Sequence, residues 1–233
     1  MVAVAPFWIA HRGGAGLAAE NTLAACEQAW RAGFRGFEFD LKLSRDGVAF
    51  VLHDDDLQRT TAVCGRASHL DWAGLQRRVD PCLPSLADLA AWCAQHPSWF
   101  NLEIKPDADA DVPTQLRWGA VIAEQVSRCW SGPTPLLSSF SIPALQGAAA
   151  AAPQLPRAWL VPRLPAGWLG CAQALGLAAI HLDADGATAA ELDAVHAAGY
   201  RLRLYTVDDP VQASSWRRLG ADGLFCDRWL DQP

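Results

Sequence analysis

The sequence lacks the features that mark several large classes of protein. Its seven cysteines are scattered, and because none forms a C-x-x-C pair, we expect neither a zinc site nor a disulfide framework. No apolar run approaches the ~20 residues that a membrane span requires. Residues 1–10 also lack the basic start of a signal peptide. These absences favour a cytoplasmic protein without stable membrane association.

Positive charge is sparse as well. The chain has 19 Lys and Arg residues against 25 Asp and Glu residues, and its formal net charge is −6. No basic stripe is present, so nucleic acid is not an expected partner. The glycines at 13, 14 and 16 are too short a pattern for a dinucleotide-binding fingerprint, and no organic cofactor is expected. One or two cations could still hold a small-molecule anionic substrate, and composition predicts no particular oligomeric state.

Short apolar runs alternate with longer helical patterns along the whole chain, which is typical of βα units around a parallel sheet. Gly33, Gly199 and Gly220 each follow a helical pattern, at a position where glycine favours a helix end. The 233 residues, 51% of them hydrophobic, suit a single domain over residues 1–233. We predict an α/β fold, a (β/α)₈ TIM barrel, with strands at 7–11, 36–40, 101–104, 136–139, 157–161, 179–182, 201–206 and 223–226.

An additional apolar run, residues 48–53, follows the second predicted strand after Asp46-Gly47. Asp-Gly between extended runs is a strong hairpin signal, so we predict a β-hairpin extension and not a ninth barrel strand. A two-residue loop would place Asp40 opposite His53, with both side chains on one face. A three-residue turn with a bulge would turn His53 to the other face, and the matching of apolar residues favours the two-residue register.

Residues 54–84 are predicted to form a short irregular insertion within the domain, before a helix at about residues 85–95. Two other helices have marked starts. Asn21 is expected to cap one of them, and Asp209 precedes Pro210 at the start of another.

Carboxylates gather at the ends of two predicted barrel strands. Glu38 and Asp40 are two residues apart, so their side chains share a face, and Glu103 ends the next strand. The carboxyl ends of barrel strands form one rim, where active sites lie. An all-oxygen site of this kind suits Mg²⁺, Ca²⁺ or Mn²⁺. The alternative is that these acids only form salt bridges with cations such as Arg12 and Lys105, but two acidic strand ends beside a histidine favour a metal.

Two histidines are expected at the same rim. His11 ends the first strand, and His53 ends the hairpin. Imidazole titrates near neutral pH, so the pair could serve as general base and general acid around one phosphate. Arg12 and Lys105 could bind the phosphoryl oxygens. By itself, His53 could equally be part of a polar strand end.

Together, these segments resemble the glycerophosphodiester phosphodiesterase family, whose sequences carry H-R-G, P-E-N-T, E-x-D, D-G and H-D in this order. The matching residues are His11-Arg12-Gly13, Ala19-Glu20-Asn21-Thr22, Glu38-Phe39-Asp40, Asp46-Gly47 and His53-Asp54. Further matches are Glu103-Ile104-Lys105, Ser139-Phe140, Tyr205-Thr206-Val207 and Asp222-Gly223. The resemblance covers almost the full chain. Ala19 replaces the usual proline, and Tyr205 replaces the common tryptophan.

The resemblance implies a metal-dependent enzyme that hydrolyses glycerophosphodiesters to sn-glycerol 3-phosphate and an alcohol, in lipid and glycerol metabolism. His11 would act as the base and His53 as the leaving-group acid, or the two roles would be exchanged, and the substrate's own 2-hydroxyl is a candidate nucleophile. The implied site comprises the catalytic pair His11 and His53, the metal ligands Glu38, Asp40 and Glu103, and the substrate-binding residues Arg12, Lys105, Phe140 and Tyr205.

Three other readings remain open. The first is a phospholipase-type or phospholipase-D-like enzyme on another phosphodiester, although no apolar or basic docking segment for a membrane substrate is evident. The second is a barrel lyase, which would not need His53 or Lys105. The third is a catalytically silent barrel that binds phosphate esters, although loss of activity would usually leave one of these positions substituted.

Overall fold

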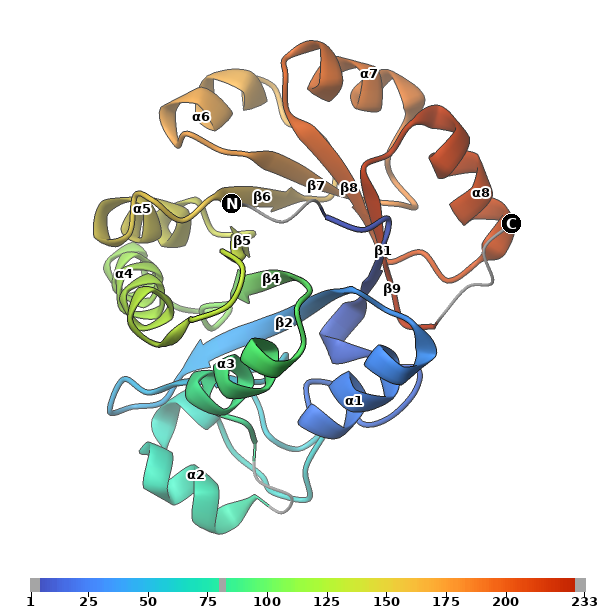
Figure 1. The fold of residues 1–233 in the computed structure, drawn as a ribbon. Helices are drawn as coiled ribbons and strands as arrows, with labels where there is room; N and C mark the ends of the chain where they lie inside the picture. The colour runs from blue at the N-terminus through green and yellow to red at the C-terminus, as the bar shows by residue number, and fades with distance from the viewer. Residues whose placement is uncertain (1–4, 80–82, 229–233) are drawn as a thin grey trace.

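A computed structural model describes residues 5–79 and 83–228, and its centre is a closed barrel (Figure 1). Eight strands run parallel in the order β1-β9-β8-β7-β6-β5-β4-β2, and pairing of β1 with β2 closes the sheet. Their bounds are β1 Trp8–Ala10, β2 Gly36–Leu43, β4 Trp99–Ile104, β5 Leu136–Ser139, β6 Arg157–Val161, β7 Ala179–Asp183, β8 Arg201–Tyr205 and β9 Gly223–Cys226. The prediction of a TIM barrel is confirmed.

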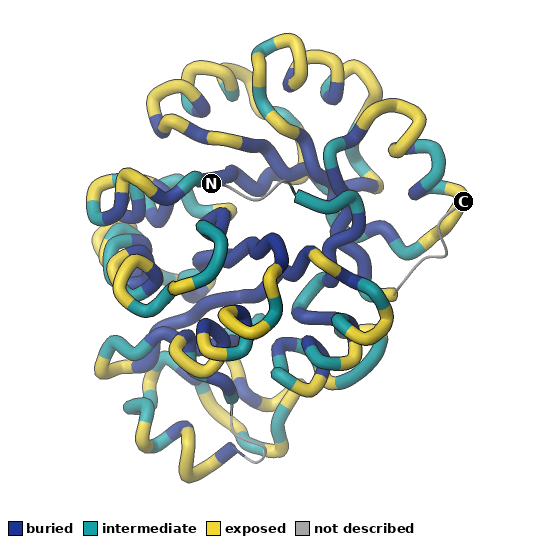
Figure 2. The backbone as a smooth tube through the Cα atoms, in the orientation of Figure 1, coloured by how far each residue is buried: buried dark blue, intermediate teal, exposed yellow. Residues whose placement is uncertain are grey.

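Helices surround the strands, and their outward faces are exposed whereas the strands are buried (Figures 1 and 2). The α-helices are α1 Leu23–Ala32, α2 Trp72–Arg78, α3 Leu86–Gln95, α4 Val112–Cys129, α5 Ile142–Ala151, α6 Trp168–Ala174, α7 Ala189–Ala197 and α8 Pro210–Leu219. As predicted, Asp209 caps α8, and Gly33 and Gly220 end α1 and α8 in the left-handed conformation. None of the helices in the described ranges is long and apolar enough to cross a membrane.

The hairpin after β2 exists, but its predicted register is wrong. Strand β3, Ala49–Val51, pairs with β2 so that Lys42 lies opposite Phe50, one residue away from the two-residue register. The loop has three residues, because the Ser44 amide donates to the Val48 carbonyl and Gly47 takes a φ of +82°. This is a three-residue turn with a glycine bulge, the alternative that the apolar pairing had disfavoured.

His53 reaches the carboxyl-end rim even so. Strand β3 ends at Val51, and the last ladder contact is the Leu52 amide donating to the Asp40 carbonyl. Beyond Leu52 the chain leaves the sheet, so the alternation of faces no longer determines where the His53 side chain points. The position of His53 was therefore predicted correctly for a wrong reason.

The insertion at residues 54–84, as far as it is described, is more regular than predicted. It contains η2, the 3₁₀ turn Ala67–His69, and α2. With the hairpin it forms a small separate apolar cluster of Phe50, Leu52, Leu57, Ala67, Leu75 and Val79. An ion pair of 2.5 Å between Arg45 and Asp71 joins it to the hairpin turn. Residues 80–82 of the predicted insertion lie outside the described residues.

The main apolar core lies between the outer face of the strands and the helices, and a smaller one lies inside the barrel. The members of the smaller core are Ile9, Trp99, Leu136, Ala158, Ala179 and Phe225. Side chains alternate along each strand, so the residues two or four positions further on line the carboxyl-terminal half of the interior. On β2 and β4 these positions carry the acids of the candidate site.

Candidate active site

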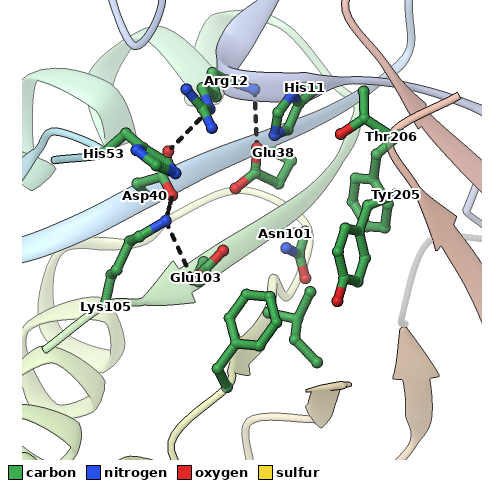
Figure 3. Close-up of a pocket in the computed structure, with 13 residues that line it drawn as sticks. His11, Arg12, Glu38, Asp40, His53, Asn101, Glu103, Lys105, Tyr205 and Thr206 are labelled. Atoms are coloured by element: carbon green, nitrogen blue, oxygen red, sulfur yellow. Dashed lines mark hydrogen bonds and ion pairs between the residues drawn. The ribbon is translucent and has the colours of Figure 1, made fainter. Parts of the chain in front are cut away.

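A pocket of about 170 Å³ opens at the carboxyl ends of the barrel strands (Figure 3). All of the residues that the sequence pointed to line it: His11, Arg12, Glu38, Asp40, His53, Glu103, Lys105, Phe140 and Tyr205. Four lining residues were not expected, namely Asn101, Leu160, Thr206 and Phe225. The structure therefore brings together the expected side chains, which come from five strands and the hairpin.

Three buried carboxylates form the acidic cluster of this pocket: Glu38, Asp40 and Glu103. One oxygen from each lies within 4.8 Å of the other two. Asp40 and Glu103 are direct neighbours across the β2–β4 ladder, and Glu38 is two residues back along β2. Burial raises the pKa of Glu38 to about 7 and that of Glu103 to about 8. Three mutually repelling acids in one buried place are costly without a counter-charge.

Neighbouring cations supply part of that counter-charge. Burial would raise the pKa of Asp40, but the charges of Lys105, His53 and Arg12 outweigh it and lower that pKa to about 2. The Lys105 ammonium lies 3.2 Å from Asp40 and 3.7 Å from Glu103, and the Arg12 guanidinium lies 3.8 Å from Asp40. The salt bridges of the alternative reading thus exist, but two cations face three acids.

A divalent cation would compensate the negative charge that Lys105 and Arg12 leave on the acidic cluster. The donors of the acidic cluster are all carboxylate oxygens, which suit hard ions such as Mg²⁺, Ca²⁺ and Mn²⁺. Glu103 Oε1 is buried and accepts no hydrogen bond within the described part of the chain, and the Lys105 ammonium lies 3.7 Å from it. A buried carboxylate oxygen of this kind needs a partner. Glu38, Asp40 and Glu103 could therefore hold the metal that the resemblance implies.

Asn21 belongs to this site, although it was expected only to cap a helix. Thr22 is the cap of α1, since its side chain accepts from the Ala25 amide. Asn21 is buried in the left-handed conformation, with a φ of +58°, and its amide donates to Asp40 Oδ2 at 2.8 Å. Asparagine tolerates that conformation better than most residues. The motif Glu20-Asn21-Thr22 contains this residue, but a polar residue before a helical pattern also predicts a helix cap.

His11 lies in the 3₁₀ turn η1, His11–Gly13, directly after β1. Its Nδ1 is 2.7 Å from Asp227, which follows β9. With Nδ1–H donating to that carboxylate, Nε2 remains available to the pocket. Burial lowers the pKa of His11, but the hydrogen bond to Asp227 and the charge of Glu38 outweigh it, so the pKa is raised. Sequence reasoning missed Asp227 because 216 residues separate the two partners.

His53 has a matching partner in the next residue. Its Nδ1 is 2.6 Å from Asp54, and Asp54 accepts in turn from Arg59 of the insertion. Burial lowers the pKa of His53, and it outweighs the opposing effect of Asp40. Both histidines are thus held through Nδ1 by a carboxylate.

Arg59 also joins the two sides of the rim. Its guanidinium contacts Glu20 at 2.6 and 2.8 Å, and Glu20 accepts from Arg12 at 3.0 Å. Arg12 itself has a left-handed φ of +49°, and its backbone amide donates to Glu38 at 2.8 Å. Arg12, which is expected to bind phosphate, is therefore held at its backbone by Glu38 and at its guanidinium by Glu20.

The opposite wall of the pocket is aromatic. The Phe140 and Tyr205 rings meet edge to face, with centroids 5.7 Å apart. Phe140 is 47% exposed and lines the pocket, so its ring is accessible to a ligand there. The Tyr205 hydroxyl is buried and has no hydrogen-bond partner in the described ranges. This wall could receive the uncharged part of a substrate.

Comparisons with known proteins agree with this geometry. Residues 11–230 match the model of the glycerophosphoryl diester phosphodiesterase family. A phosphodiesterase of Oleispira antarctica, solved in complex with its product sn-glycerol 3-phosphate, superposes with a TM-score of 0.88 at 30% identity. The superposition covers 96% of this chain and 93% of that one.

Curated relatives include the glycerophosphodiester phosphodiesterase of Bacillus altitudinis, 28% identical over 94% of this chain and 93% of its own length. The mouse glycerophosphodiester phosphodiesterase 1 is 34% identical over 43% of this chain, and the match spans 34% of that protein. The family match covers nearly the whole chain and includes every residue of the acidic cluster and both histidines. The chain belongs to the glycerophosphoryl diester phosphodiesterase family of enzymes.

Proposed function

We propose that the enzyme hydrolyses glycerophosphodiesters to sn-glycerol 3-phosphate and an alcohol, with a divalent metal and a histidine acid/base pair. The observation that carries this proposal is the convergence in one pocket of three carboxylates within 4.8 Å and two histidines, each held by its own aspartate. The product complex of the Oleispira antarctica relative supports the choice of substrate class.

Glu38, Asp40 and Glu103 would hold the metal, and Mg²⁺, Ca²⁺ and Mn²⁺ all suit their oxygens. When bound, the ion would supply a Lewis acid that polarises a phosphoryl oxygen and acidifies a nearby hydroxyl. Arg12 and Lys105 would neutralise the other phosphoryl oxygens, one as a planar fork and one as a point charge. Contacts that strengthen as charge develops on the phosphate lower the barrier.

His11 would take the proton from the attacking hydroxyl, and His53 would give a proton to the leaving oxygen. The hydrogen bond that His11 donates to Asp227 raises the pKa of His11, so the neutral imidazole is the stronger base. The lowered pKa of His53 makes its protonated form the stronger acid, and it also reduces the fraction of His53 that carries the proton at neutral pH. Either the substrate's 2-hydroxyl, through a cyclic phosphate, or water could be the group that His11 deprotonates.

Phe140 and Tyr205 would pack against the glycerol or the head group. Tyr205 offers a hydroxyl where many family members have tryptophan, so we expect a polar contact there. The cytoplasmic location and a place in lipid and glycerol metabolism stay predictions.

The experiment is release of sn-glycerol 3-phosphate from glycerophosphocholine, followed with a coupled dehydrogenase, first with chelator and then with Mg²⁺, Ca²⁺ or Mn²⁺. Metal-dependent release is the expected result. Cleavage of bis-(p-nitrophenyl) phosphate without glycerol 3-phosphate release would support the enzyme on another phosphodiester. No activity on either substrate with any metal would support the silent phosphate-ester-binding barrel.

A further inference from the structure

A second cavity, of about 270 Å³, lies at the opposite end of the barrel from the active site. Its walls come from residues that begin strands or precede them, including Trp99, Leu136, Pro156 and Ala179. These residues are apolar, and the polar part of the lining consists of Thr134, Arg201, Arg203 and Asp222. Nothing in the proposed reaction uses this end of the barrel, so the cavity needs a separate explanation.

A buried arginine lines this cavity without a hydrogen bond or ion pair, and the nearby charge of Asp222 offsets its burial only in part. The Arg203 side chain is only 7% exposed, and it makes no hydrogen bond or ion pair to any residue in the described ranges. Its guanidinium lies over the Trp99 ring, 4.6 Å from the ring centroid. That cation–π contact replaces only part of the hydration that a buried charge loses. Burial accordingly lowers the pKa of Arg203 to about 10.

The other charged residues of the cavity are already engaged. Asp222 accepts from Arg201 at 2.7 Å, from the Leu202 amide at 2.8 Å and from His196 at 2.9 Å. Its negative charge is therefore shared among other donors, and no ion pair with Arg203 forms. Two arginines and one aspartate give the lining a net positive charge. Because Asp222 is paired with Arg201, the unpaired positive charge is that of Arg203, the least exposed of the three.

His181, on the neighbouring strand, is a second buried polar side chain without a hydrogen-bond partner in the described chain. It is paired with Arg203 across the β7–β8 ladder, and both of its ring nitrogens are buried without a hydrogen-bond partner in the described chain. Two adjacent polar side chains without partners are rare in a barrel interior, where buried polar groups are nearly always satisfied. A bound anion would give Arg203 the partner that it lacks.

We propose that this cavity binds a small organic carboxylate, whose anionic group pairs with Arg203 and whose apolar part lies against Trp99 and Leu136. A planar carboxylate matches the guanidinium fork. One buried cation can compensate one negative charge, and a phosphate dianion would leave a second charge against apolar walls. The volume admits a short aliphatic chain or a single ring.

The test is calorimetric titration of the full chain with butyrate and benzoate at constant ionic strength. The neutral analogues butanol and benzyl alcohol serve as the first control. Carboxylates can also bind the active-site cations, so the titrations are repeated with glycerol 3-phosphate present and with Lys105→Met. We expect binding that survives both changes and is at least ~10-fold tighter for benzoate than for benzyl alcohol, the scale of a charge-assisted hydrogen-bonded pair.

The matched variants are Arg203→Met and Arg201→Gln. The first keeps an unbranched apolar stem and removes the charged guanidinium, and it should weaken benzoate binding by ~10-fold or more. The second removes the exposed, ion-paired arginine of the same cavity and should change binding by less than ~3-fold. If Arg203→Met does not fold, the Arg203 Nε–H resonance of the wild-type chain, assigned with Arg203→Lys, must shift on titration with benzoate. Equal binding of acid and alcohol, no binding, or an unmoved resonance would overturn the proposal.

Discussion

The two ends of the barrel interior treat buried charge in opposite ways. At the carboxyl end, Asp40 has cations at 3.2 and 3.8 Å, and His11 and His53 each have an aspartate within 2.7 Å. At the amino end, His181 and Arg203 have no hydrogen-bonded partner among the described residues. Both ends bury ionisable groups, but Asp40 and the two catalytic histidines have close charged partners, whereas His181 and Arg203 do not.

The difference follows from what adjoins the strand ends. Loops after the strands supply most of the partners at the carboxyl end, such as Asp54 after β3 and Asp227 after β9. His181 and Arg203 lie inside strands, where their neighbours are other interior side chains. A barrel can therefore orient catalytic groups only where loops reach them, which is the end where TIM-barrel sites occur.

Breaking the acidic cluster should have the largest effect. Asp40→Asn keeps the size of the side chain but removes a charged oxygen ligand, so turnover of glycerophosphocholine should fall by ~10³-fold, with partial rescue by excess metal. Metal affinity, measured by calorimetry, should fall with it. Asp71→Asn, which alters an exposed carboxylate paired with Arg45, is the control and should leave both unchanged. Unaltered metal affinity in Asp40→Asn would contradict the ligand role.

Removing one member of the histidine pair should come next. His53→Ala should lower kcat by ~10²-fold or more, because a proton donor is lost while the carboxylates remain. Metal binding should stay close to that of the wild type. The exposed His69 provides the matched control, as His69→Ala should retain full turnover. Wild-type turnover in His53→Ala would show that the acid/base pair is wrongly assigned.

A smaller effect is expected from the aspartate that orients His11. Asp227→Asn removes a negative hydrogen-bond partner that raises the pKa of His11, so this pKa should fall. His11 then becomes a weaker base, so kcat should fall, but by less than the ~10²-fold expected for the loss of a proton-transfer group. The measurement is a ¹⁵N NMR titration of His11. Reduced kcat with an unmoved His11 titration would indicate that Asp227 acts only on the structure of the loop.

The sequence predicted most of this arrangement because parallel strands impose a simple rule. Once Glu38, Asp40 and Glu103 were assigned to strand ends, the barrel required that they meet at one rim. The rule did not extend to hairpin register, which depends on whether Gly47 takes a positive φ. It did not extend to Asp227 either, whose contact with His11 joins the two ends of the chain.

A residue of the insertion, Arg59, is expected to orient His53 and Arg12 from outside the pocket. Arg59→Met removes the cation that contacts Asp54 and Glu20, so His53 and Arg12 should both become less ordered and kcat should fall by ~3-fold. Loss of that positive charge should also raise the pKa of His53. Arg45→Met removes an exposed ion pair between the hairpin turn and Asp71 of the insertion, and it should change neither quantity. An effect of equal size in both variants would reduce Arg59 to a stabilising role.

The amino end should affect stability and not turnover. Burial holds the pKa of His181 well below that of a free imidazole, so below pH ~6.5 the unfolded chain binds a proton that the folded chain does not. Stability is then lost as pH falls, with a limiting slope of ~1.4 kcal/mol per pH unit from this group. His181→Leu should remove that slope and leave turnover unchanged, whereas His69→Leu should retain it. Denaturant unfolding at several pH values between 5 and 8 measures the difference. An unchanged slope in His181→Leu would mean that the imidazole is charged in the folded barrel, which requires an anionic partner beside it.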